Sequence, residues 1–169
     1  LTLNSSEDLK FIFELGLHHE QQHQELILMD IKHIFFSNPL KPSFLNLQKK
    51  FKIYEKSENE FNLSRNVTFK FGHDSDNFCY DNECPSSSCL LQPFKLGNYI
   101  TNKDWREFII KGGYENHKYW LSDGWDYIKR EKVNKPMYWV DLDNFFTLNG
   151  LKKIDDELPV SNISYYEAQ

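Results

Sequence analysis

The pattern of apolar residues changes once along this chain, and this change constrains the fold more than any other feature. Up to about residue 36, apolar side chains recur mostly at three-to-four spacing, which predicts helix. After residue 66 the chain carries short apolar or aromatic runs separated by turn residues, the first of them at residues 67–71, a pattern typical of short strands and loops. The 169 residues are enough to bury a sizeable core. The pattern therefore predicts an α+β protein whose helical part comes first.

The first part is expected to hold two helices. Residues 5–8 (Ser-Ser-Glu-Asp) are a typical helix start, because they combine capping hydroxyls with acidic residues. Gly16 is expected to break the helix or to give a short connection. A second helix is expected over residues 17–36, and the sequence Ser-Asn-Pro at 37–39 is expected to end it.

The rest of the chain is predicted to be a linker followed by a mixed domain. Residues 39–65 lack a lasting period and are interpreted as the linker, with one short strand near 51–54. Thr101 or Asn102 is expected to cap a helix with an apolar stripe. The pairs Gly112-Gly113 and Asp123-Gly124 are interpreted as turns. The four tryptophans are assigned to core packing rather than to a ligand cage; they are Trp105, Trp120, Trp125 and Trp139.

Composition restricts the partners of the chain. The formal net charge of -5 gives no global electrostatic reason to bind nucleic acid or an anionic membrane. No apolar run approaches the roughly 20 residues that a membrane-spanning helix needs, so a soluble, cytoplasmic protein is expected. The three cysteines, at the even spacing Cys79, Cys84 and Cys89, do not match a structural zinc pattern. They are interpreted as ordinary cysteines of a reducing compartment.

The most informative residues are the histidines of the second expected helix. His19 and His23 are four residues apart, so on a helix their Cβ atoms lie about 5 to 6 Å apart on one face and both imidazoles can reach one ion. Two protein ligands are too few for a metal site, so at least one more is needed from another part of the protein. Glu25 lies on a different part of the helix surface and is interpreted as a hydrogen-bond acceptor for a ligand rather than as a ligand.

Three interpretations of this helix compete. In the first, a polar face of a bundle helix carries histidines by chance. In the second, residues 19–23 (His-Glu-Gln-Gln-His) form the zinc-protease motif HExxH with Glu20 as the base, although no further protease ligand follows. In the third, the two histidines belong to a three-histidine site for non-heme iron, with coordination positions left open for oxygen and substrate.

The wider sequence resembles a known family, the ergothioneine-biosynthesis sulfoxide synthases, and this favours the third interpretation. These proteins combine a DinB-like helical domain with a formylglycine-generating-enzyme-like domain. The resemblance rests on Leu-Gly-Leu-His-His-Glu-Gln-Gln-His-Gln-Glu-Leu at residues 15–26, and it continues in family order over nearly the whole chain. The further matching positions are 29–33, 71–74, Phe78, 80–83, 93–94, 101–102, 108–109, 112–114, 120–125, 136–139, 159–160 and 164–168.

The resemblance implies a more specific fold. It implies an α+β chain with the C-terminal helices of a DinB-like four-helix bundle over residues 1–38 and a linker over 39–65. Residues 66–169 would then be the first part of a formylglycine-generating-enzyme-like, C-type-lectin-like domain. The chain is therefore expected to be an internal part of a longer enzyme.

The resemblance also implies a chemistry. It implies an enzyme that uses Fe(2+) and O2 to join cysteine or γ-glutamylcysteine to hercynine (trimethylhistidine), giving a sulfoxide. His19 and His23 fall on two of the three iron ligands, and Gln22 on a position that helps orient the substrate. The third histidine and the catalytic tyrosine are expected outside this chain, so the catalytic residues are unknown here. The segment alone is expected to be inactive, and a non-catalytic or regulatory relative with the same fold is the main alternative.

Two further groups of polar residues are given structural roles. His33 is interpreted as a helix-end histidine that interacts favourably with the negative helix terminus. Asp74, Asp81 and Glu83 could hold a cation, but a hydrogen-bonded loop is the preferred interpretation.

Overall fold

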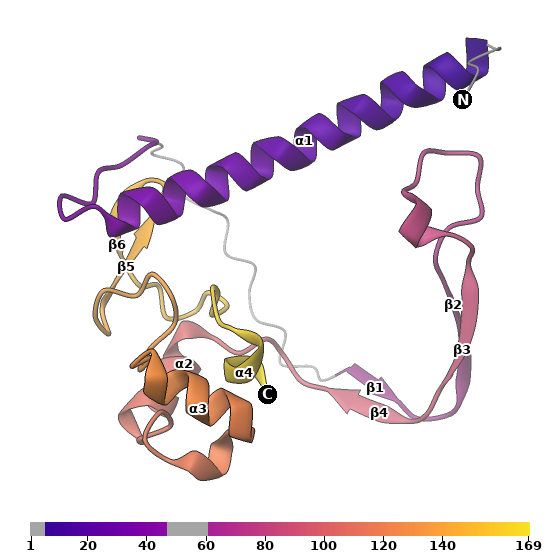
Figure 1. The fold of residues 1–169 in the computed structure, drawn as a ribbon. Coiled ribbons are helices and arrows are strands. Elements are labelled where there is room, and N and C mark those ends of the chain that lie inside the picture. Colours follow the sequence, from indigo (N-terminus) through magenta and orange to yellow (C-terminus); the bar gives the residue numbers. More distant parts are fainter. Residues whose placement is uncertain (1–5, 47–60) are drawn as a thin grey trace. The chain divides into compact units, whose positions relative to one another are not determined.

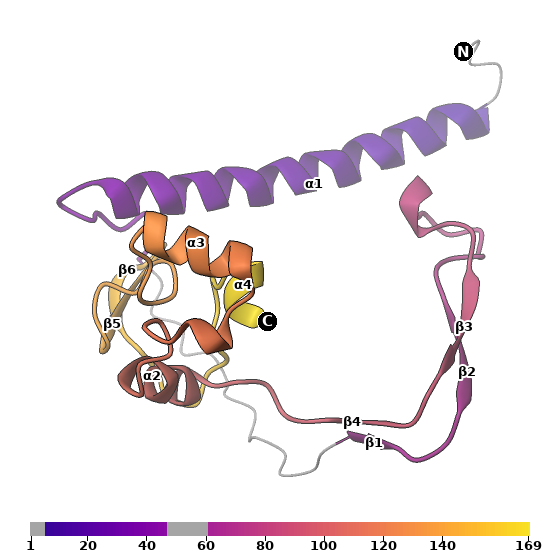
Figure 2. The same ribbon diagram turned by 60° about the horizontal axis from the view of Figure 1, so that its bottom comes forward.

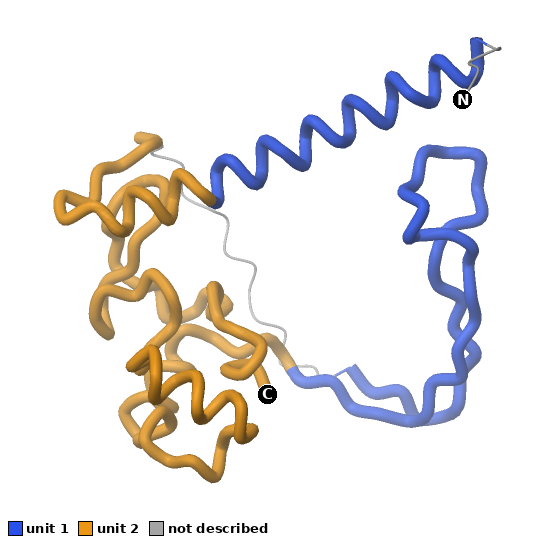
Figure 3. The backbone as a smooth tube through the Cα atoms, in the orientation of Figure 1, with its two compact units in different colours: residues 1–29, 58–97 blue, residues 30–57, 98–169 orange. Residues whose placement is uncertain are grey.

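The computed structural model describes residues 6–46 and 61–169, and its elements are labelled in Figure 1. Contacts divide the chain into two compact units. Unit 1 contains Leu1–Met29 and Glu58–Gly97, and unit 2 contains Asp30–Ser57 and Asn98–Gln169 (Figure 3). The described elements are helices and small two-stranded antiparallel sheets. The predicted α+β class is confirmed at this level.

The first helix, α1, runs without interruption from Ser6 to Ser37. The expected break at Gly16 is therefore wrong. A glycine costs a helix about 1 kcal/mol relative to alanine, and the good helix formers on both sides outweigh that cost. The predicted end of the helix is confirmed, because Asn38 N donates to Ile34 O at 3.1 Å and the Asn38 side chain then accepts from Leu40 N at 2.9 Å.

Helix α1 buries none of its residues against the described parts of the chain. Its large apolar side chains are exposed, as in Phe13 (73%), Leu17 (69%) and Met29 (63%). Its last residues, from Asp30 on, belong to unit 2, where the Phe36 ring lies 5.1 Å from the Tyr138 ring and 5.8 Å from the Phe146 ring. Among the described residues, no helix combines the length and the apolar character needed to cross a bilayer.

The strands of unit 1 form two separate ribbons. Strand β1 (Phe61–Leu63) pairs with β4 (Phe94–Leu96), and β2 (Val67–Phe71) pairs with β3 (Ser87–Leu91). The register of the second ribbon places Phe69 opposite Cys89. The apolar run at residues 67–71 thus coincides with β2. The strand expected near residues 51–54 lies outside the described residues.

Unit 2 gathers three helices and a hairpin (Figure 2). The α-helices are α2 (Asn102–Ile110), α3 (Ser122–Arg130) and α4 (Tyr165–Ala168). The hairpin joins β5 (Asn144–Thr147) to β6 (Gly150–Lys153), and the bridge between Thr101 and Pro159 ties the start of α2 to a later segment. Short 3-10 turns occur at Asp81–Glu83 (η1) in unit 1 and at His117–Tyr119 (η2) in unit 2.

The buried side chains of the described residues belong to unit 2. Those of the apolar core are Trp105, Tyr114, Ile128, Trp139 and Phe146. The core role predicted for tryptophan is confirmed for Trp105 and Trp139. Trp120 and Trp125 are half-buried, and the Trp120 indole Nε1 donates to Gly113 O at 2.8 Å.

Turns were expected at two glycine-containing pairs of unit 2, Gly112-Gly113 and Asp123-Gly124, and the structure has a turn only at the first. Gly112 has a φ of 80°, so the turn expected there is confirmed. The turn expected at Asp123-Gly124 is wrong, because both residues lie inside α3. A Cβ on Gly124 would meet Tyr166 at 2.9 Å, so glycine is needed there for close packing rather than for a turn.

The domain boundaries expected at residues 38 and 65 stay a prediction. The two contact units are a different description of the chain, because α1 contributes to both.

Candidate functional site

The two histidines singled out by the sequence face one another on α1. The ring centroids of His19 and His23 are 4.5 Å apart with an interplanar angle of 79°, and both side chains are exposed. A bond of about 2.1 Å from a ring nitrogen to a shared ion places the ring centroid about 3.2 Å from that ion. If the two bonds meet at about 90° at the ion, the two centroids are about 4.5 Å apart. The donor chemistry and the spacing of the pair therefore fit half of a metal site.

The described residues do not complete this site. No cluster of three or more His, Cys, Asp or Glu side chains with metal-binding geometry occurs within residues 6–46 and 61–169. Gln22 and Glu25, the other two residues predicted to act here, are exposed on the same helix. The roles of all four residues stay predictions.

The neighbouring His18 joins α1 to a loop of unit 1, a contact that the sequence did not reveal. Its ring stacks on Phe78 with centroids 4.1 Å apart and an interplanar angle of 16°, and Tyr80 approaches edge-on at 6.5 Å. Phe11 lies 6.4 Å from Phe78 on the same side of the helix. The loop that follows β2 is thus packed beside the helix that carries the histidine pair.

Hydrogen bonds fix the shape of this loop. Asp74 accepts from Lys70 Nζ at 2.6 Å, from Ser86 N at 3.0 Å and from the Ser86 hydroxyl. The hydrogen bond from the Lys70 ammonium, followed by the one from the Ser86 hydroxyl, lowers the pKa of the Asp74 carboxyl. Glu83 accepts from Tyr80 N at 2.8 Å. The acidic residues thus support a hydrogen-bonded loop, as preferred from the sequence.

The cysteines lie in two places. Cys89 is on β3, while Cys79 and Cys84 flank the η1 turn with their sulfur atoms 3.1 Å apart. All three are free thiols. The proximity of Cys79 and Cys84 could not be read from the spacing, since it depends on the turn between them.

Near the C-terminal end of α1, His33 contacts Tyr138, which comes from a distant segment of the chain. Its Nδ1 lies 3.4 Å from the Tyr138 hydroxyl, and the ammonium of Lys32 lies 4.2 Å from the centre of the same ring. Partial burial lowers the pKa of Lys32. The contact gives His33 a structural neighbour near the end of the helix.

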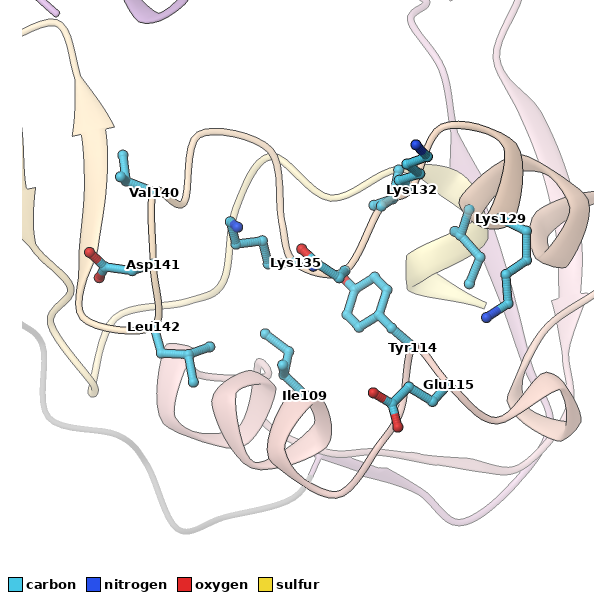
Figure 4. Close-up of a pocket in the computed structure, with 12 residues that line it drawn as sticks. Ile109, Tyr114, Glu115, Lys129, Lys132, Lys135, Val140, Asp141 and Leu142 are labelled. Carbon is cyan, nitrogen blue, oxygen red and sulfur yellow. The ribbon is translucent and has the colours of Figure 1, made fainter.

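A cavity of about 590 Å³ opens in unit 2 between α2, α3 and the segment that precedes β5 (Figure 4). Its walls are apolar at Ile109, Tyr114 and Leu142, and three lysines line it: Lys129, Lys132 and Lys135. Two acidic residues, Glu115 and Asp141, also line the cavity. Hydrogen bonds from Asn144 lower the pKa of Asp141. The sequence did not point to this cavity, because its walls come from separate segments.

The structure is that of a mixed α+β protein with a long helix on which two histidine rings lie side by side. Residues 53–169 match the sulfatase-modifying factor enzyme 1-like domain, and the chain belongs to this family. It is 28% identical over 163 residues to a hercynine oxygenase of Mycobacterium tuberculosis, an alignment that covers 94% of this chain and 37% of that protein. It is 29% identical over 93 residues to the hercynine oxygenase of Mycolicibacterium thermoresistibile, covering 54% of this chain and 21% of that protein. The matches thus span 37% of the length of the first of these relatives and 21% of the second.

Proposed function

We propose that the polypeptide containing this chain is an iron(II)- and O2-dependent sulfoxide synthase. It would form a carbon–sulfur bond between hercynine and either cysteine or γ-glutamylcysteine. The observation that carries the proposal is the similarity to a hercynine oxygenase over 94% of the chain. Because this leaves only about ten of the 169 residues unmatched, the aligned span includes His19 and His23. This role would place the enzyme in the cytoplasm.

In this proposal, His19 and His23 hold the iron through neutral imidazoles. Bound iron(II) supplies open coordination positions for the sulfur donor and O2. Glu25 accepts a hydrogen bond that orients an imidazole, and Gln22 orients the substrate beside the metal. By the resemblance, a third imidazole and a catalytic tyrosine come from positions that have no counterpart among the residues of this chain.

We assign α1 to a DinB-like bundle on the same grounds. The apolar side chains of the helix that are exposed against the described residues support this assignment, because a helix with such side chains requires neighbours to cover them. The bundle would bring the third imidazole to the His19 and His23 pair.

Iron binding by the complete polypeptide, as it is made in the cell, tests the proposal. Anaerobic titration with Fe(II) should give an affinity at least about tenfold lower for His19→Ala and for His23→Ala than for the wild type, with loss of sulfoxide formation from hercynine and either thiol. His33→Ala is the matched control, because it removes an imidazole from the same helix while leaving the pair intact. Iron binding and turnover that stay at the wild-type level in both variants of the pair would overturn the assignment. Residues 1–169 alone are expected to bind iron weakly and to show no turnover.

A non-catalytic or regulatory relative with the same fold is the second candidate. The two histidines of α1 are compatible with both candidates, so turnover by the complete polypeptide distinguishes them. A complete polypeptide that binds hercynine but gives no product with Fe(II), O2 and either thiol would support the second candidate. Zinc-dependent peptide hydrolysis that is abolished by Glu20→Gln would instead favour the protease interpretation.

A further inference from the structure

Two thiols lie together on the loop between β2 and β3. Cys79 Sγ and Cys84 Sγ are 3.1 Å apart, within hydrogen-bonding distance. A disulfide bond is about 2.05 Å long, so the two sulfur atoms need to approach by only about 1 Å. This approach is small enough for side-chain rotation with a minor adjustment of the backbone.

The backbone between the two cysteines holds them in this arrangement. Glu83 N donates to Tyr80 O at 3.0 Å, and Cys84 N donates to Asp81 O at 3.2 Å. The Glu83 carboxylate returns to accept from Tyr80 N at 2.8 Å. The η1 turn therefore places the two sulfur atoms together in the reduced protein, and His73 of the same loop supports it, because His73 N donates to Glu83 O at 2.9 Å and Cys84 Sγ donates to His73 O at 3.5 Å.

The two thiols differ in access to solvent. Cys84 is exposed, whereas Cys79 is half-buried. The hydrogen bond with Cys84 and burial, together with the negative charge of Glu83, raise the pKa of Cys79 to about 11. Cys84 is consequently the thiol that an oxidant in solution meets first, and Cys79 is the partner that completes the bond.

We propose that Cys79 and Cys84 form a reversible redox site, which a low-molecular-weight disulfide oxidises to a disulfide within the loop. The Cys84 thiolate attacks one sulfur atom of the small disulfide, breaks its S–S bond and releases one small thiolate. The Cys79 thiolate then attacks the Cys84 sulfur, forms the Cys79–Cys84 bond and releases the second small thiolate. Two protein thiols are oxidised, one small disulfide is reduced to two thiols, and the two protons pass to the released thiolates.

Cys89 is the control cysteine against which the reactivity of Cys79 and Cys84 is compared. It lies in β3 opposite Phe69, in a regular antiparallel register, and its side chain is half-buried. The disulfide exchange uses neither histidine of the pair, so it does not depend on the proposed iron chemistry. A failure of either proposal would leave the other unaffected.

Thiol mapping of the chain in glutathione redox buffers tests the proposal. After equilibration over a series of ratios of oxidised to reduced glutathione, the sample is acid-quenched, alkylated and analysed by peptide mass spectrometry. At the oxidising end two of the three thiols should be lost, with a link between Cys79 and Cys84, and dithiothreitol should restore both. Cys89→Ser should retain this link, and Cys84→Ser should show no internal link.

Three outcomes would overturn the proposal. One is a link that involves Cys89, another is glutathione attached to single cysteines without an internal link, and the third is three free thiols at the most oxidising ratio. The mapping of the wild-type chain alone decides among these outcomes, so the conclusion does not depend on whether a cysteine variant folds.

Discussion

Two glycines within helices have opposite surroundings, and these surroundings predict opposite effects of one substitution. A Cβ on Gly16 in α1 would have no neighbour within 4 Å, whereas a Cβ on Gly124 in α3 would meet the Cβ and ring atoms of Tyr166 at 2.9 to 3.0 Å. Gly16→Ala should therefore stabilise its helix by about 0.5 to 1 kcal/mol. Gly124→Ala should lower the free energy of unfolding by about 1 to 3 kcal/mol, because the overpacked ring must move.

Urea denaturation followed by circular dichroism measures both changes. The two variants are matched controls for one another, since each replaces a helical glycine by the same residue. A Gly124→Ala variant at least as stable as the wild type would show that Tyr166 can move aside without cost.

The Tyr114 hydroxyl connects three elements of unit 2 and makes its stability depend on pH. Tyr114 is 5% exposed, and its hydroxyl donates to Glu167 and accepts from Trp105 Nε1 at 3.3 Å. Burial, followed by the Glu167 carboxylate, raises the pKa of Tyr114 above its ordinary value of about 10. Below about pH 10 both folded and unfolded states keep the phenol proton, and the stabilisation is complete. Above that pH the unfolded state releases the proton while the folded state retains it, so stability falls as the pH rises.

Tyr114→Phe should have two effects. At pH 7 it should lower the free energy of unfolding by about 1 to 2 kcal/mol, because Trp105 and Glu167 each lose a hydrogen-bond partner. Above about pH 10 it should lose stability less steeply than the wild type, because the titrating phenol is gone. Urea titrations at pH 7, 10 and 11 measure both effects, with Tyr119→Phe, at a side chain 60% exposed, as the control. Equal slopes for the wild type and Tyr114→Phe would contradict the assigned cause.

At the scale of the element, the start of α2 shows what one capping residue contributes. The Thr101 hydroxyl accepts from Asp104 N at 3.1 Å, and Thr101 N donates to Asp104 Oδ2 at 2.9 Å. Thr101→Ala should lower the free energy of unfolding by about 1 to 2 kcal/mol. Thr101→Ser should retain most of the stability, because it keeps the oxygen. Thermal and urea denaturation of the three proteins make the comparison, and a serine variant as unstable as the alanine variant would assign the effect to the methyl group instead.

The same elements show which parts of the fold can be predicted from the sequence. The cap of α2, the end of α1 and the position of β2 follow from residues within a few positions of each other, and all three were predicted. Helix α3 was missed because Asp123-Gly124 resembles a turn, while the residue that explains the glycine, Tyr166, is distant in sequence.

In the candidate site, too, the features set by neighbouring residues could be predicted, and those that depend on distant residues could not. The pairing of His19 with His23 is local and follows from helical spacing. The stack of His18 on Phe78 joins distant segments, and no local pattern encodes it. The Cys79 and Cys84 pair is close in sequence, but its geometry is set by the turn between the two residues.

At the scale of the whole molecule, the two units differ in what stabilises them. Within the described part of the chain, the buried side chains belong to unit 2, and unit 1 has exposed apolar side chains on α1 and on both of its ribbons. Two-stranded ribbons without a covered face are marginally stable in water. Local opening is easiest where few apolar contacts are buried, so the units should differ in amide protection.

Hydrogen exchange followed by mass spectrometry should reveal this difference. Amides of β2 and β3 should exchange at least about tenfold faster than amides in the last turns of α2 and α3, because opening the ribbon exposes little buried surface whereas opening α2 or α3 exposes the core around Trp105 and Ile128. Gly124→Ala provides the control, since it loosens packing within unit 2 and should accelerate exchange in α3 while leaving the rate in β2 unchanged. Equal protection of β2 and α2 would mean that the ribbons of unit 1 are stabilised by contacts other than those of the described residues, and would remove burial as the cause of the difference.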